Sequence, residues 1–261
     1  MDKYAANGFS REMEFRDRSE LMNEIYRKGA RRYMEGLDLQ DAFRHTWRVS
    51  CMDEGTPNGD IRLPGSGILY DDKKMMKILG SAAEEALLEG KELVLTSHYG
   101  CGAGALKAQR LGRPATEGDY IASAIIKACA ARLGLRHSHI GKDSLKRPES
   151  HHISRIVYID NVGHFSPATT EGMPPGFVLS RKYIDNRDLA AYTKIALDIA
   201  MDKGHGFGEF ISDDEPIVVI PMARNGASAS KMTDAIAPTV KELNSAMERE
   251  NVIIDPVVIQ I

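Results

Sequence analysis

The sequence predicts an α/β fold in which a parallel β-sheet is flanked by helices. Apolar, strand-like runs alternate with helix-like segments along the 261 residues, which is typical of a parallel sheet covered on both faces. Chemically reactive side chains, Cys51 and His98, follow two of these runs directly, and ligands of such sheets bind at the carboxyl ends of the strands. We therefore expect one domain over 1–261 with a site at that edge.

The predicted elements divide the chain into three parts. Residues 1–43 predict a helical arm, because apolar residues recur at helical spacing between 21 and 33. Residues 44–147 predict the core, with strands at 45–52 and 91–98, a Gly-rich apolar segment at 60–70, and helices at 73–90 and 117–135. Residues 148–261 predict an extension of the same sheet, with strands at 155–161, 176–183, 215–222 and 255–261 and helices at 189–204 and 232–250. We detect no internal repeat.

Composition excludes several classes of protein. A net charge of -3 gives no positive field for a polyanion, so we expect no nucleic-acid partner. No apolar run reaches the roughly 18 residues that a membrane span needs, and the N-terminal residues lack the apolar core of a secretory signal. We expect a cytoplasmic protein without membrane contacts. Three cysteines are too few for a disulfide scaffold, which leaves metal binding, catalysis or core packing as their uses.

Cys51, His98 and Cys101 form a candidate set of zinc ligands. Zinc binds thiolates and imidazoles in a tetrahedron, and a catalytic site keeps the fourth position for water. His98 and Cys101 are three residues apart in a predicted strand-to-helix turn, and Cys51 ends a neighbouring strand. An H-x-x-C pair alone is more often part of a core. Asp53, two residues after Cys51, adds a polar group that can orient a metal ligand or handle a proton.

The motifs CMDE, GDIRLPGSGIL and SHYGCGAGALKA, in this order, resemble those of the β-class carbonic anhydrases: C-x-D-x-R, a Gly-rich segment, then H-x-x-C-G. The resemblance covers roughly residues 47–133 and a preceding helical arm. It implies zinc ligands at Cys51, His98 and Cys101, a parallel-sheet fold, a homodimer with sites near the subunit interface, and hydration of carbon dioxide by zinc hydroxide. It also implies that Asp53 accepts a hydrogen bond from that hydroxide.

One position departs from the family pattern. Gly55 stands where the family has the arginine that pairs with the aspartate and keeps it off the metal. An unpaired Asp53 would itself be a good zinc ligand and would close the site. Arg62 is the predicted substitute and is therefore assigned, with Asp53, to the catalytic group. Arg48 and the backbone amides of residues 54–59 are the alternatives.

Three functions remain open at this stage. The first is reversible hydration of carbon dioxide at the zinc site. The second is hydrolysis of carbonyl sulfide or carbon disulfide, which relatives with the same ligand set carry out. The third is a zinc-binding protein without activity, in which Asp53 closes the site.

Overall fold

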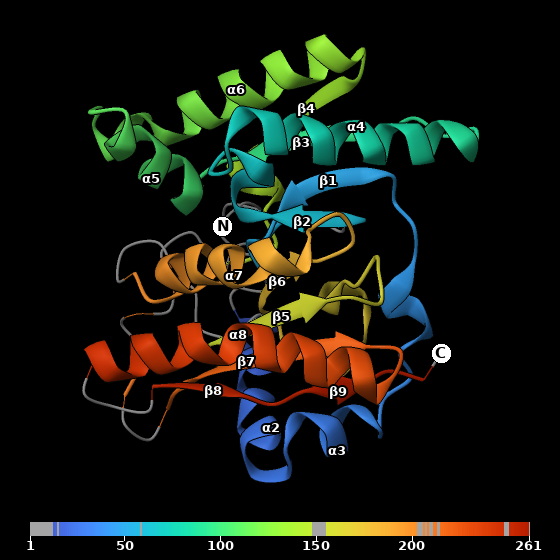
Figure 1. Ribbon diagram of the computed structural model, residues 1–261, viewed down its shortest axis with the longest axis vertical. Coiled ribbons are helices and arrows are strands. Elements are labelled where there is room, and N and C mark those ends of the chain that lie inside the picture. The colour runs from blue at the N-terminus through green and yellow to red at the C-terminus, as the bar shows by residue number, and fades with distance from the viewer. Residues whose placement is uncertain are drawn as a thin grey trace, which may run out of the picture.

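The computed structural model describes residues 13–14, 16–57, 59–147, 155–202, 206, 208, 211–212, 215–247 and 251–260, and the account below concerns these. It is an α/β structure with two parallel β-sheets flanked by helices, which confirms the predicted class (Figure 1). The first sheet has the order β2-β1-β3-β4 and is formed by β1 (Arg48–Cys51), β2 (Ile61–Leu63), β3 (Val94–His98) and β4 (Arg136–Ile140). The second has the order β6-β5-β7-β8, with β9 also paired to β7, and is formed by β5 (Ile156–Asp160), β6 (Phe177–Ser180), β7 (Ile217–Ala223), β8 (Val252–Ile254) and β9 (Val257–Val258).

The helices connect these strands and agree with most of the predicted segments. Those after residue 70 are α4 (Asp72–Leu88), α5 (Gly102–Arg110), α6 (Gly118–Leu133), α7 (Asn186–Ala200) and α8 (Gly226–Ala246). Short 3-10 helices lie at η1 (Gln40–Phe43), η2 (Pro64–Gly67), η3 (Ala115–Glu117), η4 (Lys142–Ser144) and η5 (Pro167–Thr169). α8 begins six residues earlier than its apolar pattern predicts, because the Asn225 side chain accepts the N–H of Ser228 and caps the helix there.

The second half does not extend the first sheet, which corrects our expectation for residues 148–261. β2 is an edge strand of the first sheet, β6 is an edge strand of the second, and the two lie side by side (Figure 1). Among the described residues, no β-ladder joins them. The N–H of Arg62 on β2 donates to the Ser180 hydroxyl at 2.9 Å, and the N–H of Val178 donates to the Met52 carbonyl beyond the end of β1 at 2.9 Å. The two sheets are therefore linked by one hydrogen bond to a side chain and one hydrogen bond to a loop carbonyl.

The two sheets repeat one strand order, although the sequence shows no repeat. In each half the first strand lies between the second and third, and the fourth pairs with the third. One helix, α4 or α7, follows the second strand, and α5 with α6, or α8 alone, follows the third. The two halves therefore share a topology without a shared sequence. Many different apolar residues can form the same pattern of strands and helices.

The helical arm covers the second sheet rather than the first. α2 (Met22–Lys28) and α3 (Ala30–Met34) are joined at Gly29, whose φ of 81° favours glycine. Their apolar side chains pack on Ile156 and Tyr158, while Val157 and Ile159 point to the opposite face, where α7 and α8 lie. Within the part of the chain that the structure describes, no helix is long and apolar enough to cross a membrane.

Candidate metal centre

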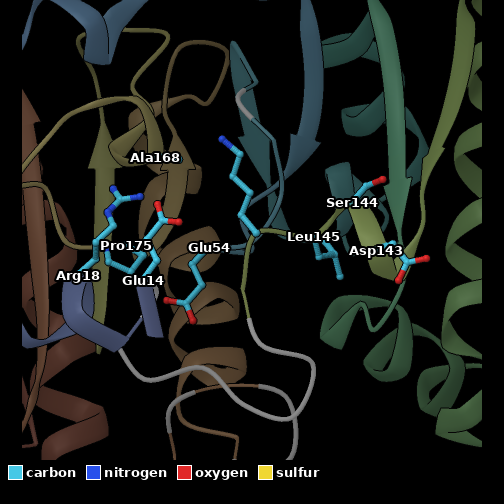
Figure 2. A pocket seen from close by; sticks show the side chains of 9 residues that line it. Glu14, Arg18, Glu54, Asp143, Ser144, Leu145, Ala168 and Pro175 are labelled. Carbon is cyan, nitrogen blue, oxygen red and sulfur yellow. The ribbon is translucent and has the colours of Figure 1, made fainter. Parts of the chain in front are cut away.

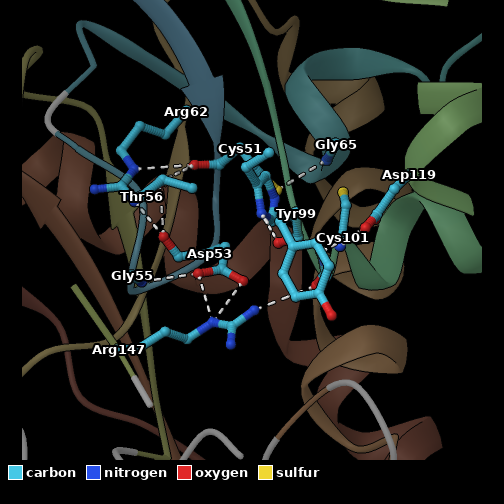
Figure 3. Close-up of polar contacts among 12 residues, drawn as sticks. Cys51, Asp53, Gly55, Thr56, Arg62, Gly65, Tyr99, Cys101, Asp119 and Arg147 are labelled. Carbon is cyan, nitrogen blue, oxygen red and sulfur yellow. Dashed lines mark hydrogen bonds and ion pairs between the residues drawn. The ribbon is translucent and has the colours of Figure 1, made fainter. Parts of the chain in front are cut away.

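Cys51, His98 and Cys101 converge at the carboxyl edge of the first sheet, as the sequence predicts. Figure 3 shows Cys51 and Cys101 of this group. Cys51 ends β1, His98 ends β3, and Cys101 is the N-cap of α5. One ligand atom from each lies within 4.8 Å of the other two, and the residues are 4%, 1% and 3% exposed. Ligand atoms of a tetrahedral zinc site are about 3.3–3.8 Å apart, from bond lengths of about 2.0–2.3 Å. Small side-chain adjustments would therefore complete such a site.

The hydrogen bonds of His98 direct one ring nitrogen into this cluster. Nδ1 lies 2.8 Å from the Tyr99 carbonyl oxygen, which can only accept, so Nδ1 carries a proton in this bond. Nε2 is buried and has no hydrogen-bond partner among the described residues. A buried nitrogen without a partner is costly, and a metal ion bound by two thiolates would satisfy it.

The Gly-rich segment supplies a backbone donor to Cys51. The N–H of Gly65 donates to the Cys51 Sγ at 3.2 Å. Gly65 has a φ of 57°, and a Cβ there would lie 2.7 Å from Ile68 and 2.8 Å from Ala103. Glycine is thus favoured by the backbone conformation and by the lack of space for a side chain between Ile68 and Ala103.

Asp119, at the start of α6, fixes the turn that carries Cys101, and sequence reasoning did not find it. Its carboxylate accepts the N–H of Gly100 at 2.8 Å and the N–H of Cys101 at 2.9 Å. Acidic side chains in the first turn of a helix are common because they interact favourably with the helix dipole. The sequence therefore did not indicate that Asp119 binds the turn before α5.

The three donors share protons in the metal-free protein. Burial opposes charge on Cys51, but a hydrogen bond from Cys101 and the positive charge of His98 hold the pKa of the Cys51 thiol well below its usual value. The same hydrogen bond, with burial, raises the pKa of Cys101 well above its usual value. Burial lowers the pKa of His98, but the charge on Cys51 outweighs it and raises that pKa to about 9. In the metal-free protein Cys101 therefore holds its proton more firmly than Cys51 does.

Arg147, from the segment after β4, pairs with Asp53. Its Nε lies 3.0 Å from both carboxylate oxygens, and the two side chains are 4% and 6% exposed. Arg147 also donates to the Gly100 carbonyl at 3.2 Å, so it joins Asp53 to the turn before Cys101. Burial lowers the pKa of Arg147, but the charge of Asp53 outweighs this effect and raises it.

The structure explains the glycine at position 55. A Cβ on Gly55 would lie 2.2 Å from the Cγ of Arg147, so the arginine stem fills the space that a side chain at 55 would need. The N–H of Gly55 also donates to Asp53 Oδ1 at 2.8 Å. One of the backbone amides predicted as alternatives therefore does hold Asp53. The cation that pairs with Asp53 is Arg147, which lies 92 positions after Gly55 in the chain.

Arg62 lies near Asp53 but donates to groups other than the Asp53 carboxylate, which corrects that assignment. Its guanidinium donates to the backbone carbonyls of Cys51 and Asp53 and to the Thr56 hydroxyl, whereas the Asp53 carboxylate is paired with Arg147. Arg62 is 1% exposed, and burial lowers its pKa to about 10. The geometry gives Arg62 a structural role in holding the loop after β1.

A cleft of about 300 Å³ is lined by the sequence neighbours of Asp53 and Arg147, and Figure 2 shows its lining side chains. Glu54, which follows Asp53, and Lys146, which precedes Arg147, both line it. The remaining lining residues come from the arm, from η4 and from the second half: Glu14, Arg18, Asp143, Ser144, Leu145, Ala168 and Pro175. Three acidic and two basic side chains line the cleft together with apolar ones, so it is partly polar.

The second half lacks an equivalent set of donors. Asn225 is the N-cap of α8 as Cys101 is of α5, and Met222 precedes it by three residues as His98 precedes Cys101. Strand register then aligns β5 with β1 and places Ile159 at the position of Cys51. Isoleucine, methionine and asparagine do not form a zinc site.

Comparisons with models of known protein families, with curated proteins and with solved structures give no match.

Proposed function

We propose that this chain is a zinc enzyme that reversibly hydrates carbon dioxide to bicarbonate. The observation that carries the proposal is the position of Asp53 relative to the three zinc donors. Asp53 is bound by Arg147 and by the N–H of Gly55, and it is not part of the group of ligand atoms within 4.8 Å of one another. This arrangement supports a metal with its fourth position free.

The donor set fits zinc. Two cysteines and one histidine match the soft and borderline donors that zinc prefers, and the partnerless Nε2 of His98 lies in the cluster. Cys51, His98 and Cys101 would hold the ion. When bound with an open position, zinc lowers the pKa of a coordinated water to about 7 and so provides a nucleophile at neutral pH.

The residues around the donors have separate tasks in this proposal. Asp53, fixed by Arg147, would accept a hydrogen bond from the attacking water and orient it. The Gly65 N–H and the Tyr99 carbonyl would orient Cys51 and His98. The partly polar cleft would offer protons a route between the site and solvent.

The experiment combines metal analysis with turnover. Purified protein should contain at least one zinc per chain and hydrate carbon dioxide in stopped-flow measurements with a pH indicator. Cys101→Ser should lose the activity and one equivalent of zinc. Cys129→Ser is the matched control, because Cys129 is equally buried but lies in α6 outside the donor cluster.

Other outcomes distinguish the remaining functions. Turnover of carbonyl sulfide or carbon disulfide without hydration of carbon dioxide would assign the site to hydrolysis. Zinc with no turnover and with four protein ligands in X-ray absorption would assign it to a non-catalytic protein. Absence of zinc would reject the centre. The homodimer and the cytoplasmic location stay predictions.

A further inference from the structure

A second group of metal-ligating side chains lies between the two halves. His45 precedes β1, Asp60 precedes β2, and His164 follows β5, so the chain brings three separate segments together. One ligand atom from each lies within 4.8 Å of the other two. The Nδ1 of His164 lies 3.0 Å, and that of His45 3.8 Å, from Asp60 Oδ1, and the ring centroids are 3.5 Å apart.

Asp60 is fixed in place by the backbone of the segment that carries His45. The N–H of Thr46 donates to Oδ1 at 2.8 Å and the N–H of Arg48 to Oδ2 at 3.2 Å, and Asp60 is 4% exposed. The His45 segment and the carboxylate thus form one unit. Preorganised ligands of this kind are typical of metal sites.

His164 is held in a backbone conformation that residues other than glycine rarely adopt. Its φ is 66°, in the left-handed region. The fully buried Asp160 accepts the N–H groups of Val162, Gly163 and Phe165 at 2.8–3.0 Å, which clamps the loop on both sides of His164. Such strain concentrates at functional sites, where the surrounding structure imposes it.

The hydrogen bonds within the group do not satisfy both rings. Oδ1 of Asp60 already accepts the N–H of Thr46, and a carboxylate oxygen has about two lone pairs, so it cannot also accept protons from both imidazoles. Of the two imidazoles, only that of His164 lies within hydrogen-bond distance of that oxygen, and the Nδ1 of His45 is 3.8 Å from it. A cation between these three atoms would bind all three.

The charges around the group leave room for a cation. Lys182 and Glu85 both act on His45, but they form an ion pair with each other, so their charges offset. The carboxylate of Asp60 therefore supplies a negative charge beside the two imidazoles. Two imidazole nitrogens and one carboxylate oxygen are the donors of borderline divalent transition metals.

We propose that His45, Asp60 and His164 bind one divalent transition-metal ion at a second site, separate from the Cys-His-Cys centre. The ion links His45 and Asp60 of the first half to His164 of the second. It therefore stabilises the contact between the halves when bound. This inference does not depend on the proposed carbon dioxide chemistry.

Cobalt titration of the metal-free full-length protein tests the site. Co²⁺ bound by cysteines has an intense thiolate charge-transfer band in the near ultraviolet, whereas Co²⁺ bound by nitrogen and oxygen has only weak visible bands. We expect two equivalents to bind, of which one adds no thiolate band. His45→Ala and His164→Ala should each weaken that equivalent at least about tenfold, and leave the thiolate band unchanged. His139→Ala is the control, because His139 is exposed on β4 outside both groups.

His45→Ala should disturb folding least, because the His45 side chain is 45% exposed. Circular dichroism checks that each variant is folded. Binding of only the thiolate-type equivalent would overturn the proposal. So would a second equivalent whose affinity is the same in His45→Ala, His164→Ala and wild type, since that ion would be bound elsewhere.

Discussion

Replacing Arg147 with alanine tests the ion pair on which the open site depends. The Arg147 Nε lies 3.0 Å from both oxygens of Asp53, and both side chains are almost fully buried. Removing one member of a buried pair leaves the other charge without its partner, which typically costs about 3–5 kcal/mol. Asp53 keeps the N–H of Gly55, so we expect the lower end, about 3 kcal/mol, in the metal-free protein.

Zinc should change the size of this loss. In Arg147→Ala the released carboxylate is free to bind the metal, so the zinc-loaded variant should lose less unfolding free energy than the metal-free variant. Its activity should disappear as the fourth position closes. Urea unfolding with and without zinc measures the first effect, and stopped-flow hydration measures the second. Arg136→Ala, which removes an exposed arginine paired with Glu92, should change stability by less than about 0.5 kcal/mol.

A double-mutant cycle separates the pair from simple loss of packing. Arg147→Ala should cost about 1–3 kcal/mol less in an Asp53→Ala background than in the wild type, because the charge that it strands is then absent. Additive losses, or a single-variant loss below about 1 kcal/mol, would refute the reasoning. An active Arg147→Ala enzyme would show that Asp53 needs no cation to stay off the metal.

Three further predictions follow from the same site. Gly55→Ala should destabilise the protein by about 1–3 kcal/mol in urea unfolding, and by much less in an Arg147→Ala background, because its Cβ meets the arginine stem. Zinc binding near pH 7.5 should release the protons of His98 and Cys101, and zinc affinity should rise with pH to above 9, because the pKa of Cys101 lies well above its usual value; indicator-dye measurements that find no release would contradict this. Asp119→Ala should weaken zinc binding about 10–100-fold in competition with a chelator, whereas unchanged affinity would remove its assigned role.

Local patterns predicted that Cys51, His98 and Cys101 lie together, because these residues stand at or next to strand ends and strand ends are visible in the sequence. The apolar run before His98 and the turn after Cys51 placed both at the edge of a parallel sheet, where the structure has them. The helix 73–90 was equally clear, since Asp71 caps it and Gly90 follows it. These features depend on neighbours within a few residues.

Arg147 and the second sheet depend on contacts between distant residues. No local feature near 147 indicates that its guanidinium reaches Asp53, 94 positions earlier. Arg62 was the nearer candidate, but its side chain serves the carbonyls of the loop after β1. The end of the first sheet at β2 was not predictable either. It depends on a distant residue, because the Arg62 N–H donates to the Ser180 side chain instead of to another strand.

The shared strand order of the two halves has an evolutionary consequence. Duplication and fusion of one ancestral gene would give such a chain, and selection would then need to preserve only one copy of the chemistry. In such a chain the half with Ile159, Met222 and Asn225 would keep its strands and helices as support for its neighbour. Placing cysteine, histidine and cysteine at these three positions is the engineering experiment that asks whether the second half can hold a donor cluster of its own.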